Sequence, residues 1–191
     1  MPSLLLSRRV AVQHLGSAAL AILLIGALPG HAAYAEEQPS WVFYRNAVPA
    51  FQILYPTTLT AKRVGKRMAP DTTLVEEWQL PGDAGDIRLT VTDGSAGGNM
   101  SDWIQKHVGG NSVRLDIAGL RGASVESLSD GVYAVAIYLD EPKSDTVIGF
   151  TLSIRNVPPG TTLSQAQLAN RATVTNFWRM VESIDLGGDR G

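Results

Sequence analysis

VYAVAIYLDEPKSDTVIGFTLSI, residues Val132–Ile154, is the stretch that decides the fold. Two runs rich in β-branched and aromatic residues flank a polar break at Asp140–Asp145, which predicts a long antiparallel hairpin. In the second run, large apolar side chains alternate with Gly149 and small hydroxyl residues. Alternation of this kind predicts one buried face and one face covered by small groups or water. The buried face is expected to carry Ile148, Phe150, Leu152 and Ile154.

The rest of the chain supplies more strands and two helices. Alternating or compact apolar runs predict strands over 41–44, 51–55, 74–80, 87–91, 113–117 and 123–128. Glu76 interrupts the third of these, which suggests an edge position or a strand end. The segment 57–70 is expected to be an irregular connection. A short helix is expected over 102–108, and a long one over 165–181 after Ser164. The pattern indicates an α+β domain, in which an antiparallel sheet is packed by a long C-terminal helix and one short helix.

The first 35 residues read as a signal peptide. Arg8 and Arg9 precede the apolar run Leu15–Leu28, and Ala33-Tyr34-Ala35 offers small residues where a signal peptidase cleaves. An uncleaved anchor is the alternative, and the paired arginines leave the twin-arginine and general export routes both open. The sequence therefore predicts a leader at 1–35, a linker at 36–40, one domain at 41–186 and a disordered tail at 187–191. The mature protein would be periplasmic or secreted, without a transmembrane segment.

Composition excludes several kinds of chemistry. The chain has no cysteine, so disulfides, thiol catalysis and cysteine-ligated metals are ruled out. The leader holds two of the 16 basic residues and none of the 18 acidic ones, so the mature chain carries a net charge of −4. A weakly acidic chain gives no reason to expect nucleic acid as a partner. Two of the three histidines, His14 and His31, leave with the leader, and His107 remains.

Three short motifs lie along the expected domain: Phe51-x-Ile53-x-Tyr55-Pro56, Ile117-x-Gly119-Leu120-x-Gly122 and Phe177-x-x-Met180-Val181-x-Ser183-Ile184. Together they resemble the PsbP-like family of exported domains, which are related to the lumenal extrinsic subunit of photosystem II. They resemble the family's opening strand with its terminal proline, its mid-domain glycine turn and its closing helix. The resemblance covers nearly all of 41–186 and implies an α/β/α sandwich. Such folds serve as accessory and binding modules for unrelated partners, so fold alone does not give the function.

One charge run stands out. Lys62, Arg63, Lys66 and Arg67 place four cations within six positions of the expected connection. Such a run can dock on an acidic protein or an anionic surface, although a solvated loop has the same composition. We take these four residues as the candidate partner-binding surface.

Other chemistry-bearing residues have a structural interpretation as well as a functional one. The glycine-rich loop 93–98 before the short helix could form an anion-binding nest, but it lacks the P-loop lysine and a flexible strand-to-helix connection is the better interpretation. The acidic hairpin tip at Asp140, Glu141 and Asp145 could bind calcium weakly or be a solvated turn. His107 falls four residues after Trp103 and is expected to pack there rather than to act as a base.

These observations favour an exported, non-enzymatic accessory domain that contacts a protein partner or an envelope surface. No catalytic, metal or cofactor residue is nominated, and no cofactor is expected. The first alternative is a small-molecule carrier with an apolar pocket near Trp78, Trp103 or Trp178. The second alternative is a hydrolase of unknown type, although no G-x-S-x-G nucleophile elbow is present.

Overall fold

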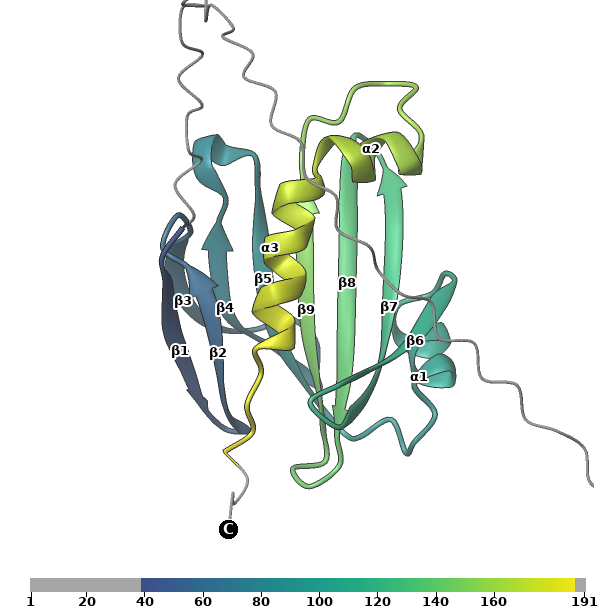
Figure 1. The fold of residues 1–191 in the computed structure, drawn as a ribbon. Coiled ribbons are helices and arrows are strands. Elements are labelled where there is room, and N and C mark those ends of the chain that lie inside the picture. The colour runs from purple at the N-terminus through teal and green to yellow at the C-terminus, as the bar shows by residue number, and fades with distance from the viewer. Residues whose placement is uncertain (1–38, 188–191) are drawn as a thin grey trace, which may run out of the picture. The chain divides into compact units, whose positions relative to one another are not determined.

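The computed structural model describes residues 39–187, so the expected leader, most of the linker and the end of the tail lie outside the described residues. Seven antiparallel strands form the main sheet in the order β3-β4-β5-β9-β8-β7-β6, and β1 pairs with β2 in a separate hairpin (Figure 1). The strands are β1 (Trp41–Ala47), β2 (Ala50–Pro56), β3 (Thr60–Arg67), β4 (Thr72–Gln79), β5 (Gly85–Asp93), β6 (Ser112–Ile117), β7 (Leu120–Ser129), β8 (Val132–Glu141) and β9 (Thr146–Ile154). The helices are α1 (Met100–His107), α2 (Leu163–Ala169), α3 (Arg171–Glu182) and the short 3₁₀ turn η1 (Pro81–Asp83).

The predicted hairpin is confirmed as β8 and β9, near the middle of the sheet. The register runs without interruption from Tyr133 opposite Ile154 to Glu141 opposite Thr146. The expected inner face is also confirmed, because Ile148, Phe150 and Leu152 are fully buried. Burial alternates in the second half of β9, where Thr151 and Ser153 are half-buried between core residues, whereas the first half is buried on both faces.

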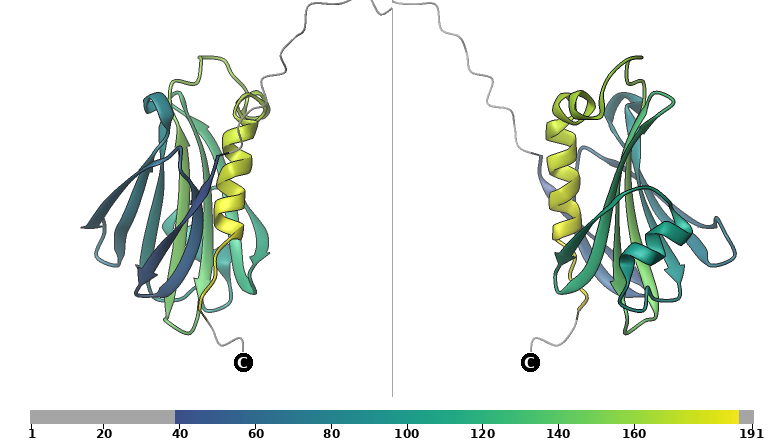
Figure 2. Two further views of the ribbon diagram at one scale, coloured as in Figure 1. Left: turned by 60° about the vertical axis from the view of Figure 1, so that its left-hand side comes forward. Right: turned by 90° about the vertical axis from the view of Figure 1, so that its right-hand side faces the viewer.

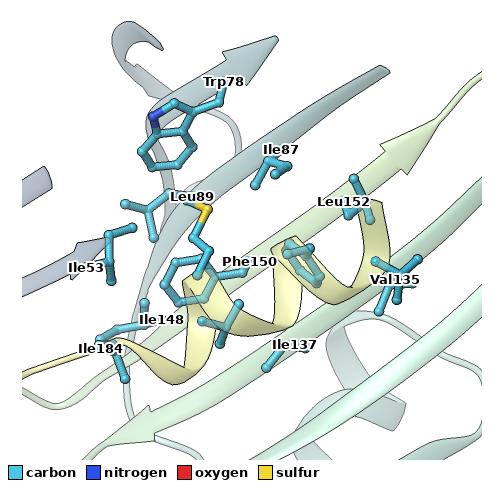
Figure 3. Close-up of a cluster of buried hydrophobic side chains, with 14 of the residues drawn as sticks. Ile53, Trp78, Ile87, Leu89, Val135, Ile137, Ile148, Phe150, Leu152 and Ile184 are labelled. Atoms are coloured by element: carbon cyan, nitrogen blue, oxygen red, sulfur yellow. The ribbon is translucent and has the colours of Figure 1, made fainter. Parts of the chain in front are cut away.

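The first layer against the sheet is built by α3 together with the β1–β2 hairpin (Figures 1 and 2). The helix contacts β2 and β9, so the end of the chain closes over strands from its beginning and its middle. Figure 3 shows aliphatic and aromatic side chains of the sheet meeting those of the helix and of β2. Burial of this apolar surface is the main term that stabilises the domain.

The opposite face of the sheet is covered only in part. The helix α1 lies against β6 and β7, where Met100, Trp103 and Ile104 form a small second cluster with Ala123 and Val125. These layers confirm the α+β class and the α/β/α arrangement. Elsewhere this face is polar: the buried Asp86 carboxylate accepts from the Arg155 guanidinium. Its other oxygen lies 3.1 Å from Arg88 Nε.

The expected irregular connection at 57–70 is wrong, because most of it is the strand β3. Lys62 lies opposite Glu77 and Arg67 opposite Thr73, with a bulge in which Val64 and Gly65 face one residue of β4. Gly65 adopts φ of 56°, a left-handed conformation that glycine reaches without a steric penalty. Glu76 is not at an edge either, since β4 pairs with β3 on one side and β5 on the other.

The expected long terminal helix is two helices. Thr162, not Ser164, caps α2, and its hydroxyl and the Gln165 side chain satisfy each other's backbone N–H groups in a capping box. Asn170 separates α2 from α3, with φ −108° and ψ 18°, and its side chain donates to the carbonyl of Ala166. Local bonding by an asparagine side chain competes with helix continuation, so the chain turns here.

Candidate partner-binding surface

The four predicted cations all lie on β3, at an open edge of the main sheet. Every residue of the strand except Val64 is exposed. A strand at an edge presents unpaired backbone N–H and C=O groups along its outer side. The structure therefore joins two features that the sequence did not connect, a basic run and a free strand edge.

The register divides the four cations between the two faces of the sheet. Lys62 is opposite Glu77 and Lys66 is opposite Leu74, and the β4–β5 register places these partners on the polar face. Arg63 is opposite Glu76, on the face that carries the main core. Arg67 shares that face and ion-pairs with Asp93 at 3.5 Å, with both side chains more than half exposed. A solvated pair of this kind contributes little to stability. The Arg67 guanidinium also donates to the Pro70 carbonyl.

Arg63 has a buried acidic neighbour that sequence reasoning missed. The Glu76 residue is 4% exposed, although it carries a carboxylate. Burial raises the pKa of this carboxyl, and the Arg63 guanidinium acts in the opposite direction. Burial also raises the pKa of the nearby Tyr44 hydroxyl, and the Glu76 charge adds to this rise. The adjacent glutamates in β4, following a basic run, were the available signal for cross-strand pairing.

The positive charges on β3 determine the charge that an added strand must carry. Half of its eight residues are Lys or Arg, so a second copy of β3 would bring like charges together. Like charges directly opposite each other on paired strands are destabilising, whereas opposite charges stabilise the pair. An acidic extended segment would satisfy both the backbone groups and the cations.

The glycine-rich loop is not an open anion nest. The backbone N–H of Ser95 donates to the Asp145 carboxylate at 2.8 Å, and that of Ala96 donates to the Asp140 carboxylate at 2.7 Å. The Glu141 carboxylate accepts from the backbone N–H of Lys143 at 2.9 Å. These three acidic side chains organise two loops. Asp140 and Glu141 are buried, so the hairpin tip is not the simple solvated turn of the sequence interpretation.

His107 packs on Trp103 as expected from their spacing. The two rings stack with centroids 4.5 Å apart, and His107 Nδ1 lies 2.9 Å from the Trp103 carbonyl oxygen. Both residues line a cavity of about 450 Å³ beside the start of α1. Asp71, Asp93, Asp102 and Lys106 share its wall, which makes it a polar surface site.

The apolar ligand site of the carrier alternative has no support at Trp78. Its side chain is fully buried between Tyr44 and Tyr55, at centroid distances of 5.4 and 5.6 Å, so aromatic rings fill the space around it. A second cavity of about 580 Å³ lies between the loop after β9 and α2, and neither Trp78 nor Trp178 lines it. Within residues 39–187, no helix is long and apolar enough to cross a membrane.

Comparisons with known proteins bear on the fold. No family model matches the chain, and no curated protein matches it in sequence. Among solved structures, it is similar to cyanobacterial PsbP (CyanoP) from Synechocystis sp. PCC 6803. The TM-score is 0.51 at 14% identity, covering 84% of this chain and 98% of that one.

Two other structures are more distant. A protein from Bacteroides thetaiotaomicron VPI-5482 has a TM-score of 0.39 at 11% identity, covering 71% of this chain and 44% of that one. A protein of unknown function from Pseudomonas aeruginosa has a TM-score of 0.35 at 7% identity, covering 73% and 94%. The order of the elements, the layers and the cyanobacterial likeness together show that this chain has a PsbP-like fold.

Proposed function

We propose that this protein is an exported, non-enzymatic accessory domain that binds an acidic, extended segment of a protein partner at β3. The observation that carries the proposal is an exposed edge strand bearing Lys62, Arg63, Lys66 and Arg67. The partner segment adds to the sheet through backbone hydrogen bonds, and its carboxylates pair with the four cations. Because the cations lie on both faces of the strand, acidic residues at successive positions of the segment would each meet one.

The first test is capture of partners from envelope extract. The mature domain, residues 36–191, is compared with a variant in which the four β3 cations are replaced by glutamine. The matched control replaces two lysines and two arginines elsewhere, namely Lys106, Lys143, Arg121 and Arg171, all exposed. Both variants lose the same charge. We expect the β3 variant to lose an acidic partner that the wild type and the control retain, and equal capture by all three would refute the proposal.

The second test separates strand addition from simple charge attraction. An extended peptide with glutamates at successive positions, flanked by threonines, is titrated into isotopically labelled protein, and backbone amide shifts are followed by NMR. A control peptide with the same charges carries N-methyl groups on every amide, which removes the backbone donors from both of its edges. We expect shifts centred on β3 with the first peptide and at least ~10-fold weaker binding of the second. Equal binding of both peptides would contradict strand addition.

An anionic surface is the competing target for the same cations. Vesicles containing anionic phospholipid test it directly, since surface attraction needs charge but no strand pairing. Retention of the wild type on such vesicles, without any effect of the acidic peptide on that retention, would favour the surface over the protein partner.

The export part of the proposal rests on the leader sequence. We expect the protein recovered from the producing cells to begin at Glu36, which intact-mass measurement would show. A protein that keeps Met1–Ala35 and sediments with membranes would instead support an anchored form.

A further inference from the structure

The opposite edge of the main sheet is also open, and its chemistry differs from that of β3. Among the strands that the structure describes, β6 pairs with β7 alone, and it carries Ser112-Val113-Arg114-Leu115-Asp116-Ile117. Val113 is 69% exposed, and Arg114 and Asp116 are also exposed, although α1 packs against the neighbouring face. No described residue lies within ion-pairing distance of Arg114 or Asp116. The strand therefore exposes to solvent one apolar side chain and two side chains of opposite charge that are not ion-paired.

The turn after β6 tells which backbone groups point away from the sheet. Ala118 and Gly119 both have positive φ, 54° and 78°, and they join Ile117 directly to Leu120. A two-residue turn of this kind is closed by a hydrogen bond between its flanking residues. The backbone N–H and C=O groups of successive residues point to opposite edges of a strand. Those of Ile117, Leu115 and Val113 therefore point to β7. The N–H and C=O groups of Arg114 and Asp116 consequently face the open edge.

Two antiparallel copies of β6 are complementary to each other. In an antiparallel pair of two copies centred on Leu115, Arg114 of each copy lies opposite Asp116 of the other. The outward backbone groups of these two residues then exchange hydrogen bonds, as a paired position of an antiparallel ladder requires. On the other face, Leu115 meets Leu115 and Val113 meets Ile117. The two-fold symmetry gives the Arg114–Asp116 and Val113–Ile117 contacts twice, whereas the Leu115–Leu115 contact lies on the axis and occurs once.

Neighbouring registers are disfavoured by charge. A shift of the pairing by two positions keeps the backbone groups matched, but it places Arg114 against Arg114 or Asp116 against Asp116. Both arrangements are repulsive across a strand pair. One register therefore satisfies the backbone, the charges and the apolar face together.

We propose that the protein forms a two-fold symmetric dimer through antiparallel pairing of β6 with β6 of a second copy, centred on Leu115. Six residues from each copy bury less surface than a standard interface, so the dimer is weak and depends on concentration. The two main sheets become one continuous sheet, with a basic β3 strand at each outer edge.

Charge exchange tests the pairing, and every variant is the full mature chain. R114D puts two acidic residues on each edge, and D116R puts two basic ones there. We expect either variant alone to raise the dissociation constant by about tenfold or more relative to the wild type. An equimolar mixture of the two should dimerise, because each acidic edge meets a basic one. The double variant R114D/D116R should dimerise alone.

Sedimentation equilibrium over about 10 μM to 1 mM measures each sample, the range in which a small interface is expected to associate. Circular dichroism confirms that each variant is folded, since Arg121 lies opposite Asp116 within the chain and D116R brings two cations together. A wild type that stays monomeric at the highest concentration would overturn the proposal. So would single variants that associate like the wild type, or a mixture that remains monomeric.

Cross-linking provides a measurement that does not depend on the charge variants. The chain contains no cysteine, so L115C introduces a single thiol. Residues directly opposite at a position without paired hydrogen bonds approach closely enough for a disulfide. Mild oxidation should link L115C into covalent dimers and leave the control V113C monomeric, because two copies of position 113 are four residues out of register. Equal cross-linking of both variants would contradict the predicted centre.

Discussion

Glu76 and Arg63 lie directly opposite each other in the ladder between β4 and β3, one buried and the other exposed. The edge strand thus places a cation over a carboxylate that faces the core. This pair links the proposed binding surface to the stability of the domain, because any partner that draws Arg63 away also changes the surroundings of Glu76.

The first prediction concerns the pH dependence of stability. Burial raises the pKa of Glu76 in the folded state above its ordinary value. Between those two pKa values the folded protein binds the proton more strongly, so the contribution is fully present below the ordinary pKa and is lost as pH rises. Glu76→Gln cannot titrate. We expect the free energy of unfolding of this variant, relative to wild type, to be higher at pH 7 than at pH 3.5, as measured by urea denaturation.

Glu77→Gln is the control, because Glu77 lies next to Glu76 but on the polar face and pairs with Arg88. Its difference from wild type should not show the same rise with pH. Parallel curves for wild type and Glu76→Gln across this range would show that the Glu76 carboxyl titrates alike in the folded and unfolded states.

The second prediction concerns the centre of the core. Phe150 is fully buried in β9, so Phe150→Ala should lower the free energy of unfolding by about 3–5 kcal/mol. Phe43→Ala removes the same ring from a side chain that is 63% exposed, and we expect a change below about 1 kcal/mol. Chemical denaturation of both variants measures the contrast, and equal losses would mean that the inner face of the sheet is misassigned.

The third prediction concerns the loop before α1. Asp140→Ala leaves the backbone N–H of Ala96 without its carboxylate acceptor and should cost about 1–3 kcal/mol. Hydrogen exchange at Ala96 should accelerate more than exchange at the core amide of Phe150. Asp130→Asn, in an exposed turn, is the matched control and should leave the exchange of Ala96 unchanged. Unaltered exchange in Asp140→Ala would show that this contact does not hold the loop.

The fourth prediction concerns a close approach between strands. A methyl group on Gly85 would overlap the backbone carbonyl oxygen of Ser153, which cannot rotate away. Gly85→Ala should therefore destabilise the domain by about 1–3 kcal/mol or more. At Gly149 the nearest atom is Thr90 Oγ1, at 2.5 Å, and a side chain can move. We expect Gly149→Ala to cost less, and the reverse order of thermal midpoints would contradict this reading.

The central hairpin could be predicted from the sequence because its core face carries large apolar side chains at every second position, such as Ile148, Phe150 and Leu152. β3 could not be predicted in this way. An edge strand exposed on both faces buries nothing, so Lys62, Arg63, Lys66 and Arg67 follow no apolar period and resemble a loop. The four candidate residues were identifiable from their charge, but their division between two faces depends on the bulge at Val64 and Gly65.

The break in the terminal helix was also hidden, for a different reason. Asn170 is compatible with a helix, and the apolar spacing continues across it, so no period changes at the break. The true start was visible in principle, because Thr162 and Gln165 have the spacing of a capping box. Which edge a strand occupies, and whether two cations share a face, depend on pairing between distant segments, which one sequence does not display.

The loop between β5 and α1 has given its backbone donors at Ser95 and Ala96 to two carboxylates of the same molecule. A tethered acceptor acts at an effective concentration in the millimolar range or above, which a dissolved anion must exceed to displace it. The glycine-rich turn before α1 therefore attaches this loop to the β8–β9 hairpin. It resembles a phosphate-binding loop in composition alone.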